Sequence, residues 1–138
     1  MRAATTTAWT KPSNIEVILS DPESALAGCT PAKVAKEGFQ PISASAESRD
    51  IGKLHLAGDA AGFGEFWADA KTARLISAGL LCSDAANLIH LPAYAIDHEH
   101  TMHQLEDAEF YHPTKIEIIL RDWRRALPET GRPSVRPG

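Results

Sequence analysis

Short apolar runs separated by turn-forming residues occupy much of the chain. Residues 15–19 form a strand-like run that ends at the turn-forming string 20–23, and residues 25–28 can continue it. Residues 39–46 are predicted to be extended, and residues 63–68 and 74–82 form the two arms of a predicted hairpin. The second arm is almost entirely apolar, which indicates a strand covered on both faces by helices or by a second subunit.

Helical signals lie between and after these strands. Residues 30–38 predict a short helix, because threonine and proline stand at its start and glycine just after its end. Asp84 can cap a helix that runs through about residue 97, and Pro92 is expected to kink it. The order of strand, helix, several strands and then helices favours an α+β fold over a doubly wound sheet.

Two further helices are predicted near the end of the chain. Thr101 and Gln104 have the spacing of a capping box, and Pro113 fits the first position of a longer helix. Apolar residues recur on that longer helix at three- and four-residue intervals, which indicates a buried stripe. The stripe consists of Ile116, Ile119, Leu120, Trp123 and Leu127.

Length and composition indicate a single globular unit. The chain has 138 residues and 43% apolar content, which suits one hydrophobic core. Residues 14–127 are expected to fold as one domain. Residues 1–13 and the Pro/Gly-rich residues 128–138 lack periodic apolar positions and are expected to be flexible ends.

Charge and targeting signals narrow the possible partners and location. The 14 basic and 18 acidic residues give a net charge of −4, which offers no broad attraction for nucleic acid or for an anionic membrane. No apolar run approaches the ~20 residues needed to span a bilayer, and no hydrophobic signal core follows Met1. The sequence therefore predicts a cytoplasmic protein. Cys29 and Cys82 lack a Cys-x-x-Cys partner and are expected to be buried small hydrophobes.

The candidate chemistry centres on the string Phe110 to Thr114 and on Glu117. Proline fixes its own φ and pushes the preceding residue to an extended conformation, so His112 is expected at the entrance of a helix. Glu117 then lies in the first turns. A carboxylate bonded to one ring nitrogen fixes the tautomer of a histidine, which is the base-and-orienter arrangement of many enzymes. By itself, the spacing is more typical of an ordinary cap beside a surface acid.

A second cluster offers a metal-binding alternative. His98, His100 and His103 lie close together in sequence with a carboxylate among them, and three imidazoles with a carboxylate can form an open metal site. A polar loop between two helices explains the same residues. Convergence of the three rings would require the loop to fold back.

Several strings in register resemble one family, the C-terminal dimerisation domain of the FAD/NAD-linked disulfide oxidoreductases, and its dihydrolipoamide dehydrogenase-like branch in particular. The match runs from about residue 14 to 126. The matching strings are Ser20-Asp21-Pro22-Glu23, Gly62-Phe63, Ala68-Asp69, Lys71-Thr72, Leu75-Ile76, the helix-opening string 85–90, Thr101 with Leu105, and His112-Pro113-Thr114 with Glu117.

The resemblance implies a mainly antiparallel sheet with helices packed on one side. It also implies a homodimer in which His112, oriented by Glu117, acts as the acid/base at the redox disulfide of the opposite subunit. A cis peptide is expected between His112 and Pro113. FAD and NAD are implied for the complete enzyme. They would bind domains upstream or on another chain, because this sequence has no G-x-G-x-x-G after a strand and no redox cysteine pair.

Departures from the family pattern qualify these expectations. Lys115 and Ile116 replace the usual Leu and Ser, and Cys82-Ser83 replaces a Gly-Pro turn. No cofactor is expected in this chain, and it is not expected to be active by itself. The alternatives are a non-catalytic homodimeric interaction module and a metal-binding protein that uses the cluster from His98 to His103. Neither the dithiol substrate nor the natural extent of the polypeptide follows from the sequence.

Overall fold

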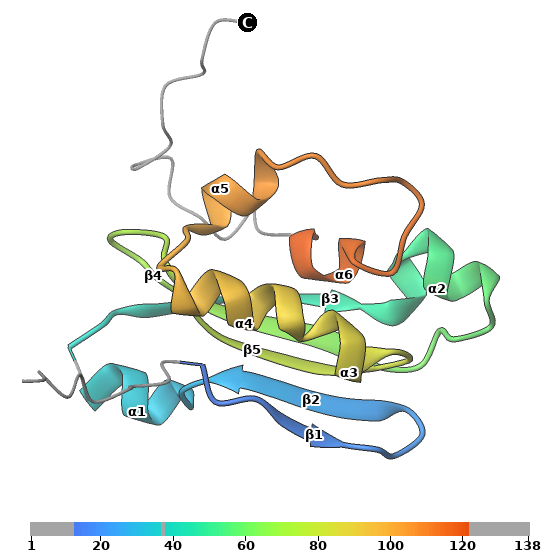
Figure 1. The fold of residues 1–138 in the computed structure, drawn as a ribbon, viewed down its shortest axis with the longest axis horizontal. Helices are drawn as coiled ribbons and strands as arrows, with labels where there is room; N and C mark the ends of the chain where they lie inside the picture. Colours follow the sequence, from blue (N-terminus) through green and yellow to red (C-terminus); the bar gives the residue numbers. More distant parts are fainter. Residues whose placement is uncertain (1–12, 37, 122–138) are drawn as a thin grey trace, which may run out of the picture.

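The computed structural model describes residues 13–36 and 38–121 as a sheet covered by helices (Figure 1). The predicted flexible ends 1–13 and 128–138 lie outside these residues, apart from Ser13, as do Trp123 and Leu127 of the predicted stripe. The strands are β1 (Glu16–Ile18), β2 (Glu23–Gly28), β3 (Pro41–Glu47), β4 (Phe63–Asp69) and β5 (Leu75–Cys82). The helices are α1 (Pro31–Lys36), the short 3-10 helix η1 (Ser48–Asp50), α2 (Gly52–Leu56), α3 (Ala85–Leu88), α4 (His90–Asp97), α5 (Met102–Glu106) and α6 (Glu117–Leu120).

The five strands form one antiparallel sheet in the order β1-β2-β5-β4-β3. Helices α3 and α4 pack on β2 and β5, and α6 packs on β3 and β4. Alternate strand residues point to opposite faces, so the buried alanines of β2 and β3 point to the helices while Ile18, Leu26 and Phe63 lie exposed on the other face. The predicted α+β fold, with a mainly antiparallel sheet and helices on one side, is confirmed.

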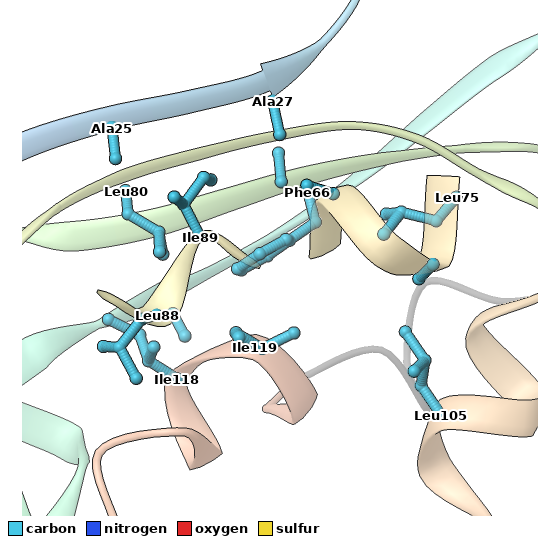
Figure 2. Close-up of a cluster of buried hydrophobic side chains, with 14 of the residues drawn as sticks. Ala25, Ala27, Phe66, Leu75, Leu80, Leu88, Ile89, Leu105, Ile118 and Ile119 are labelled. Atoms are coloured by element: carbon cyan, nitrogen blue, oxygen red, sulfur yellow. The ribbon is translucent and has the colours of Figure 1, made fainter. Parts of the chain in front are cut away.

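The core lies between the sheet and helices α3, α4, α5 and α6. Phe66 of β4 is completely buried, and its ring points from the sheet toward Ile119 of α6 (Figure 2). Ile89 and Ile118 are also fully buried in this cluster. Small residues such as Ala25, Ala44 and Ala78 line the sheet beneath them, which lets the helices approach the strands closely.

The segment predicted as one helix from Asp84 to about residue 97, kinked by Pro92, forms two separate helices. It divides into α3 and α4 at Ile89, one turn before the proline. Pro92 has no N–H for the carbonyl of Leu88, and its ring crowds that carbonyl, so the backbone hydrogen bond that would join the two helices is missing. A single helix with a kink was predicted, and the chain forms two helices instead.

The start of α3 also differs from the prediction. Asp84 adopts a left-handed backbone with φ 69°, and its side chain caps no backbone N–H; its Oδ1 accepts from the side chain of Asn87 instead. The N–H of Ala86 donates to Glu23 Oε2 of β2 at 2.9 Å. The helix N-terminus therefore receives its carboxylate from a distant strand, which the local sequence does not reveal. The capping box of Thr101 and Gln104 is confirmed.

Asp69 anchors the turn between β4 and β5, where a turn was predicted. Its carboxylate accepts hydrogen bonds from the hydroxyl of Thr72 at 2.7 Å and from the backbone N–H groups of Thr72 and Gln40 at 3.1 and 3.2 Å. Burial acts to raise the pKa of Asp69, but these hydrogen bonds together outweigh it and hold the pKa below its ordinary value of 3.8.

Replacing Asp69 with asparagine is expected to lower the free energy of unfolding by about 1–2 kcal/mol at neutral pH. Because the pKa is lowered in the folded state, the carboxylate stabilises the fold above its unfolded pKa, and this contribution is lost as the pH falls through the folded pKa. The difference between wild type and Asp69→Asn in urea unfolding should therefore shrink below pH 3.8. The exposed Asp107→Asn is the matched control. A difference that persists unchanged in acid would contradict this account.

Candidate active site

His112 and Glu117 form a hydrogen-bonded pair at the end of the loop that leads into α6. Nδ1 of His112 lies 3.1 Å from Oε1 of Glu117. The side chain of His112 is 78% exposed and that of Glu117 is 27% exposed. An ionised carboxylate can only accept hydrogen bonds, so Nδ1 carries the proton and Nε2 presents its lone pair on the open side of the ring. The structure thus brings the two predicted residues together, Glu117 as the group that orients the ring and His112 as the base. The imidazole of His112 is accessible to solvent.

The backbone around His112 is held by a compact set of local hydrogen bonds. The N–H of Thr114 donates to the same Glu117 oxygen, Oε1, at 2.7 Å, and the Thr114 hydroxyl donates to the carbonyl of Tyr111 at 2.9 Å. The peptide bond between His112 and Pro113 is cis, as expected. Glu117 therefore fixes both the histidine ring and the backbone two residues beyond it.

The helix after His112 begins later than Pro113 predicts. Residues 115 and 116 form a turn, and α6 starts at Glu117. Thr114 and Glu117 have the Thr-x-x-Glu spacing of a capping box, and the bond from Thr114 N–H to the Glu117 carboxylate is half of that motif. This signal was present in the sequence but was missed, because the proline was interpreted as the first helical residue rather than as a loop residue.

An open hollow of about 550 Å³ adjoins the loop that carries His112. Its walls come from α2, from α3 with the residue before it, and from the segment that precedes α6. Its lining residues are Lys53, Asp84, Leu88, Tyr111, Pro113, Thr114, Lys115 and Ile116. His112 itself does not line the hollow, although its neighbours Tyr111 and Pro113 do.

Lys115 is a residue at this site to which the sequence assigned no role. Its Nζ donates to Ser83 Oγ at 2.9 Å and lies 3.4 Å from Oδ2 of Asp59. Both partners are distant in sequence, so no local pattern could have revealed them. The ammonium also acts on Cys82, where burial raises the pKa of the thiol to about 11 although Lys115 acts to lower it.

The two cysteines differ in burial. Cys82 lies on β5 and is buried, as predicted, and its raised pKa keeps it a neutral thiol at physiological pH. Cys29 is half-buried, so the prediction of a fully buried residue was wrong. Cys29 directly follows β2, where the chain leaves the sheet and packing on its side chain is incomplete.

The histidines of the alternative metal site are placed in two different surroundings. His98 and His100 both lie against the ring of Tyr94, with their own ring centroids 6.2 Å apart. His103 is buried in α5, with Nδ1 4.0 Å from Glu106 Oε2. Within residues 13–36 and 38–121, no group of three or more His, Cys, Asp or Glu side chains is arranged to hold a metal ion.

Two glycines at the start of β4 allow close packing. A Cβ on Gly62, just before the strand, would clash with the carbonyl of Leu81, and one on Gly64, within the strand, would press on the ring of Phe66. The space beside both glycines is therefore filled by the neighbouring strand and by the core.

The structure thus places an exposed His-Glu pair beside cis Pro113, on a domain built as an antiparallel sheet under helices. The family model "pyridine nucleotide-disulphide oxidoreductase, dimerisation domain" matches residues 15–122. The chain belongs to this family, which confirms the resemblance seen in its sequence.

The chain is also similar to individual proteins, and the solved structures among them share its fold. The chain is 27% identical over 110 residues to the dihydrolipoyl dehydrogenase of Haloferax volcanii, a match that covers 80% of this chain and 23% of that protein. Among solved structures, LpdA from Mycobacterium tuberculosis matches with a TM-score of 0.77 at 17% identity. The match covers 86% of this chain and 26% of the LpdA chain. The Escherichia coli flavoprotein disulfide reductase RclA has a TM-score of 0.71 at 23% identity, with 76% and 24% covered. The chain thus spans about a quarter of the length of these relatives.

The described residues include no helix that is both long enough and apolar enough to cross a bilayer.

Proposed function

We propose that this chain acts as the dimerisation domain of a dihydrolipoamide dehydrogenase-like flavin disulfide oxidoreductase and supplies the His112-Glu117 pair to the redox disulfide of a partner subunit. One observation carries the proposal: the imidazole is braced through Nδ1 by a carboxylate while its Nε2 side lies open. A histidine that served its own domain would face the protein interior. A histidine presented outward suits a reacting group that another polypeptide supplies.

The chemistry assigned to His112 is proton transfer during thiol–disulfide exchange. Nε2 accepts the proton of a dithiol substrate as its sulfur attacks one sulfur of the redox disulfide, which forms a mixed disulfide and releases a thiolate. The second substrate thiol gives its proton to the thiolate released in the first step and attacks the mixed disulfide, so the substrate leaves oxidised and the redox pair is left as one thiol and one thiolate. Glu117 keeps Nδ1 protonated and stabilises the imidazolium between these steps.

The same proposal assigns the cofactors to other domains. FAD and NAD would be held by domains upstream of this chain or on another chain, and the reduced redox pair would pass its electrons to the flavin there. Self-association would be supported by the exposed apolar residues Ile18, Leu26 and Phe63 on the open sheet face. A homodimer in the cytoplasm remains the predicted state.

A chimeric reductase provides the test. In the Haloferax volcanii dihydrolipoyl dehydrogenase, the segment of 110 aligned residues would be replaced by the matching part of this chain. The chimera is expected to be dimeric by light scattering, to bind FAD, and to oxidise dihydrolipoamide with NAD, whereas the reductase without any dimerisation domain should be inactive. A dimeric, FAD-loaded chimera without activity would count against the catalytic role.

A further inference from the structure

The loop that carries His112 has few attachments to the rest of the fold. Within residues 107–120, which are all described, the backbone hydrogen bonds are local, and the side-chain bonds of Thr114 and Glu117 also stay within the loop. Within these residues, the hydrogen bonds that reach distant segments come from Lys115. The far end of the segment is held separately, by the buried Ile118 and Ile119 of α6 and by a hydrogen bond from Arg121 to the carbonyl of Asp50 at 2.7 Å. Lys115 is therefore the long-range hydrogen-bonded contact that lies nearest to His112 in the sequence.

Lys115 reaches its two partners from a half-buried position. Its side chain is 25% exposed and that of Asp59 is 37% exposed. Asp59 follows α2, and Ser83 follows β5, so one ammonium joins the His112 loop to two separate parts of the framework. A charge-assisted bond in a half-buried setting is stronger than one at a fully exposed surface, and two acceptors restrict the ammonium to one location.

The bond between Lys115 and Ser83 is the shorter of the two contacts, at 2.9 Å, and it joins residues 32 positions apart in the sequence.

We propose that Lys115 is a positioning residue for His112. It acts through its neighbour Thr114, whose N–H and hydroxyl fix Glu117 and the carbonyl of Tyr111 on either side of the histidine. The inference builds on the proposed catalytic role of His112, and it identifies what holds the imidazole in place. Without the contacts of Lys115 to Ser83 and Asp59, the His-Glu pair stands on a loop whose remaining hydrogen bonds are internal.

Amide hydrogen exchange on the full chain, followed by NMR, tests directly whether the contacts of Lys115 hold the loop in place. In Lys115→Met the exchange rate of the Thr114 N–H is expected to rise about tenfold, as for the loss of one net hydrogen bond. The buried Ile119 amide of α6 should keep its wild-type rate, which would show that the domain is still folded. Lys115→Arg should retain most of the Thr114 protection, because it keeps the charge and the N–H donors.

Matched variants distinguish the loss of the Lys115 contacts from the loss of a positive charge in general. Lys53 lines the same hollow, so Lys53→Met removes one positive charge there and is expected to leave Thr114 exchange unchanged. Ser83→Ala removes one acceptor of Lys115 and should raise Thr114 exchange in the same direction as Lys115→Met. Because both substitutions break one contact, the double variant should exchange no faster than Lys115→Met.

The chimeric reductase distinguishes failure of this inference from failure of the proposed function. Lys115→Met is expected to lower kcat for dihydrolipoamide oxidation about tenfold and to change KM less than about twofold, because positioning affects the reacting geometry more than binding. Wild-type Thr114 exchange and kcat in Lys115→Met would overturn the inference even if His112 is essential. Full activity of His112→Gln would instead overturn the catalytic proposal, whatever Thr114 exchange shows.

Discussion

Replacing His112 with glutamine is expected to lower the rate of dihydrolipoamide oxidation by the chimeric reductase about 10²- to 10⁴-fold, the usual range for loss of a general acid/base. Glutamine has a similar size and can still bond to Glu117, so the loop should keep its shape while the proton acceptor at Nε2 disappears. The measurement is the steady-state rate at saturating dithiol. Flavin content and dimer mass should match those of the unsubstituted chimera.

The control for this substitution is His90→Gln. His90 is exposed at the start of α4 and lies outside the His112 loop. The control should retain full activity. If His112→Gln also retains it, the chain acts as an assembly module without a catalytic role, which is the alternative that the sequence left open.

Replacing Phe66 with alanine is expected to lower the free energy of unfolding by about 3–5 kcal/mol, the range for loss of a buried aromatic ring. Phe66 is completely inaccessible, and its ring fills the space between the sheet and α6. The cavity left behind cannot collapse easily, because the strand on one side and the helix on the other are held by their own hydrogen bonds. Urea unfolding at fixed protein concentration measures the loss.

Phe63 provides a control with the same side chain on the same strand. It is 42% exposed on the open face of the sheet. At a protein concentration low enough to keep the chain monomeric, Phe63→Ala should cost less than about 1.5 kcal/mol, since much of the ring then contacts solvent. Equal losses for the two variants would show that the helices do not form the packed layer described for this domain.

The sheet and the core were predictable because their signals are periodic. The hairpin arms at 63–68 and 74–82 became β4 and β5, since an apolar run bounded by a turn leaves few other solutions. The position of the break between α3 and α4 was harder to predict. Proline affects the carbonyl four residues earlier, so the two helices separate next to Leu88 and not at Pro92 itself.

The paired residues of the candidate site were predictable, but the contacts that hold the surrounding loop were not. The spacing of His112, Pro113 and Glu117, together with the family resemblance, predicted a pair that the structure does form. The contacts of Lys115 with Asp59 and Ser83 span 56 and 32 residues, so only the three-dimensional fold brings these side chains together. The cap that Glu23 provides for α3 was missed for the same reason.

A disulfide trap tests most directly whether His112 serves a sulfur centre on another polypeptide. In the chimeric reductase, His112→Cys places a thiol where the imidazole lies, and Ser45→Cys on the exposed side of β3 is the control. Disulfide formation requires Cα atoms within about 7 Å, so only a residue that meets the redox cysteines can be joined to them. The account predicts a covalent dimer with Cys at position 112 mapped by mass spectrometry to a redox cysteine of the other subunit. A folded, FAD-loaded dimer in which His112→Cys forms no more of this link than Ser45→Cys would contradict it.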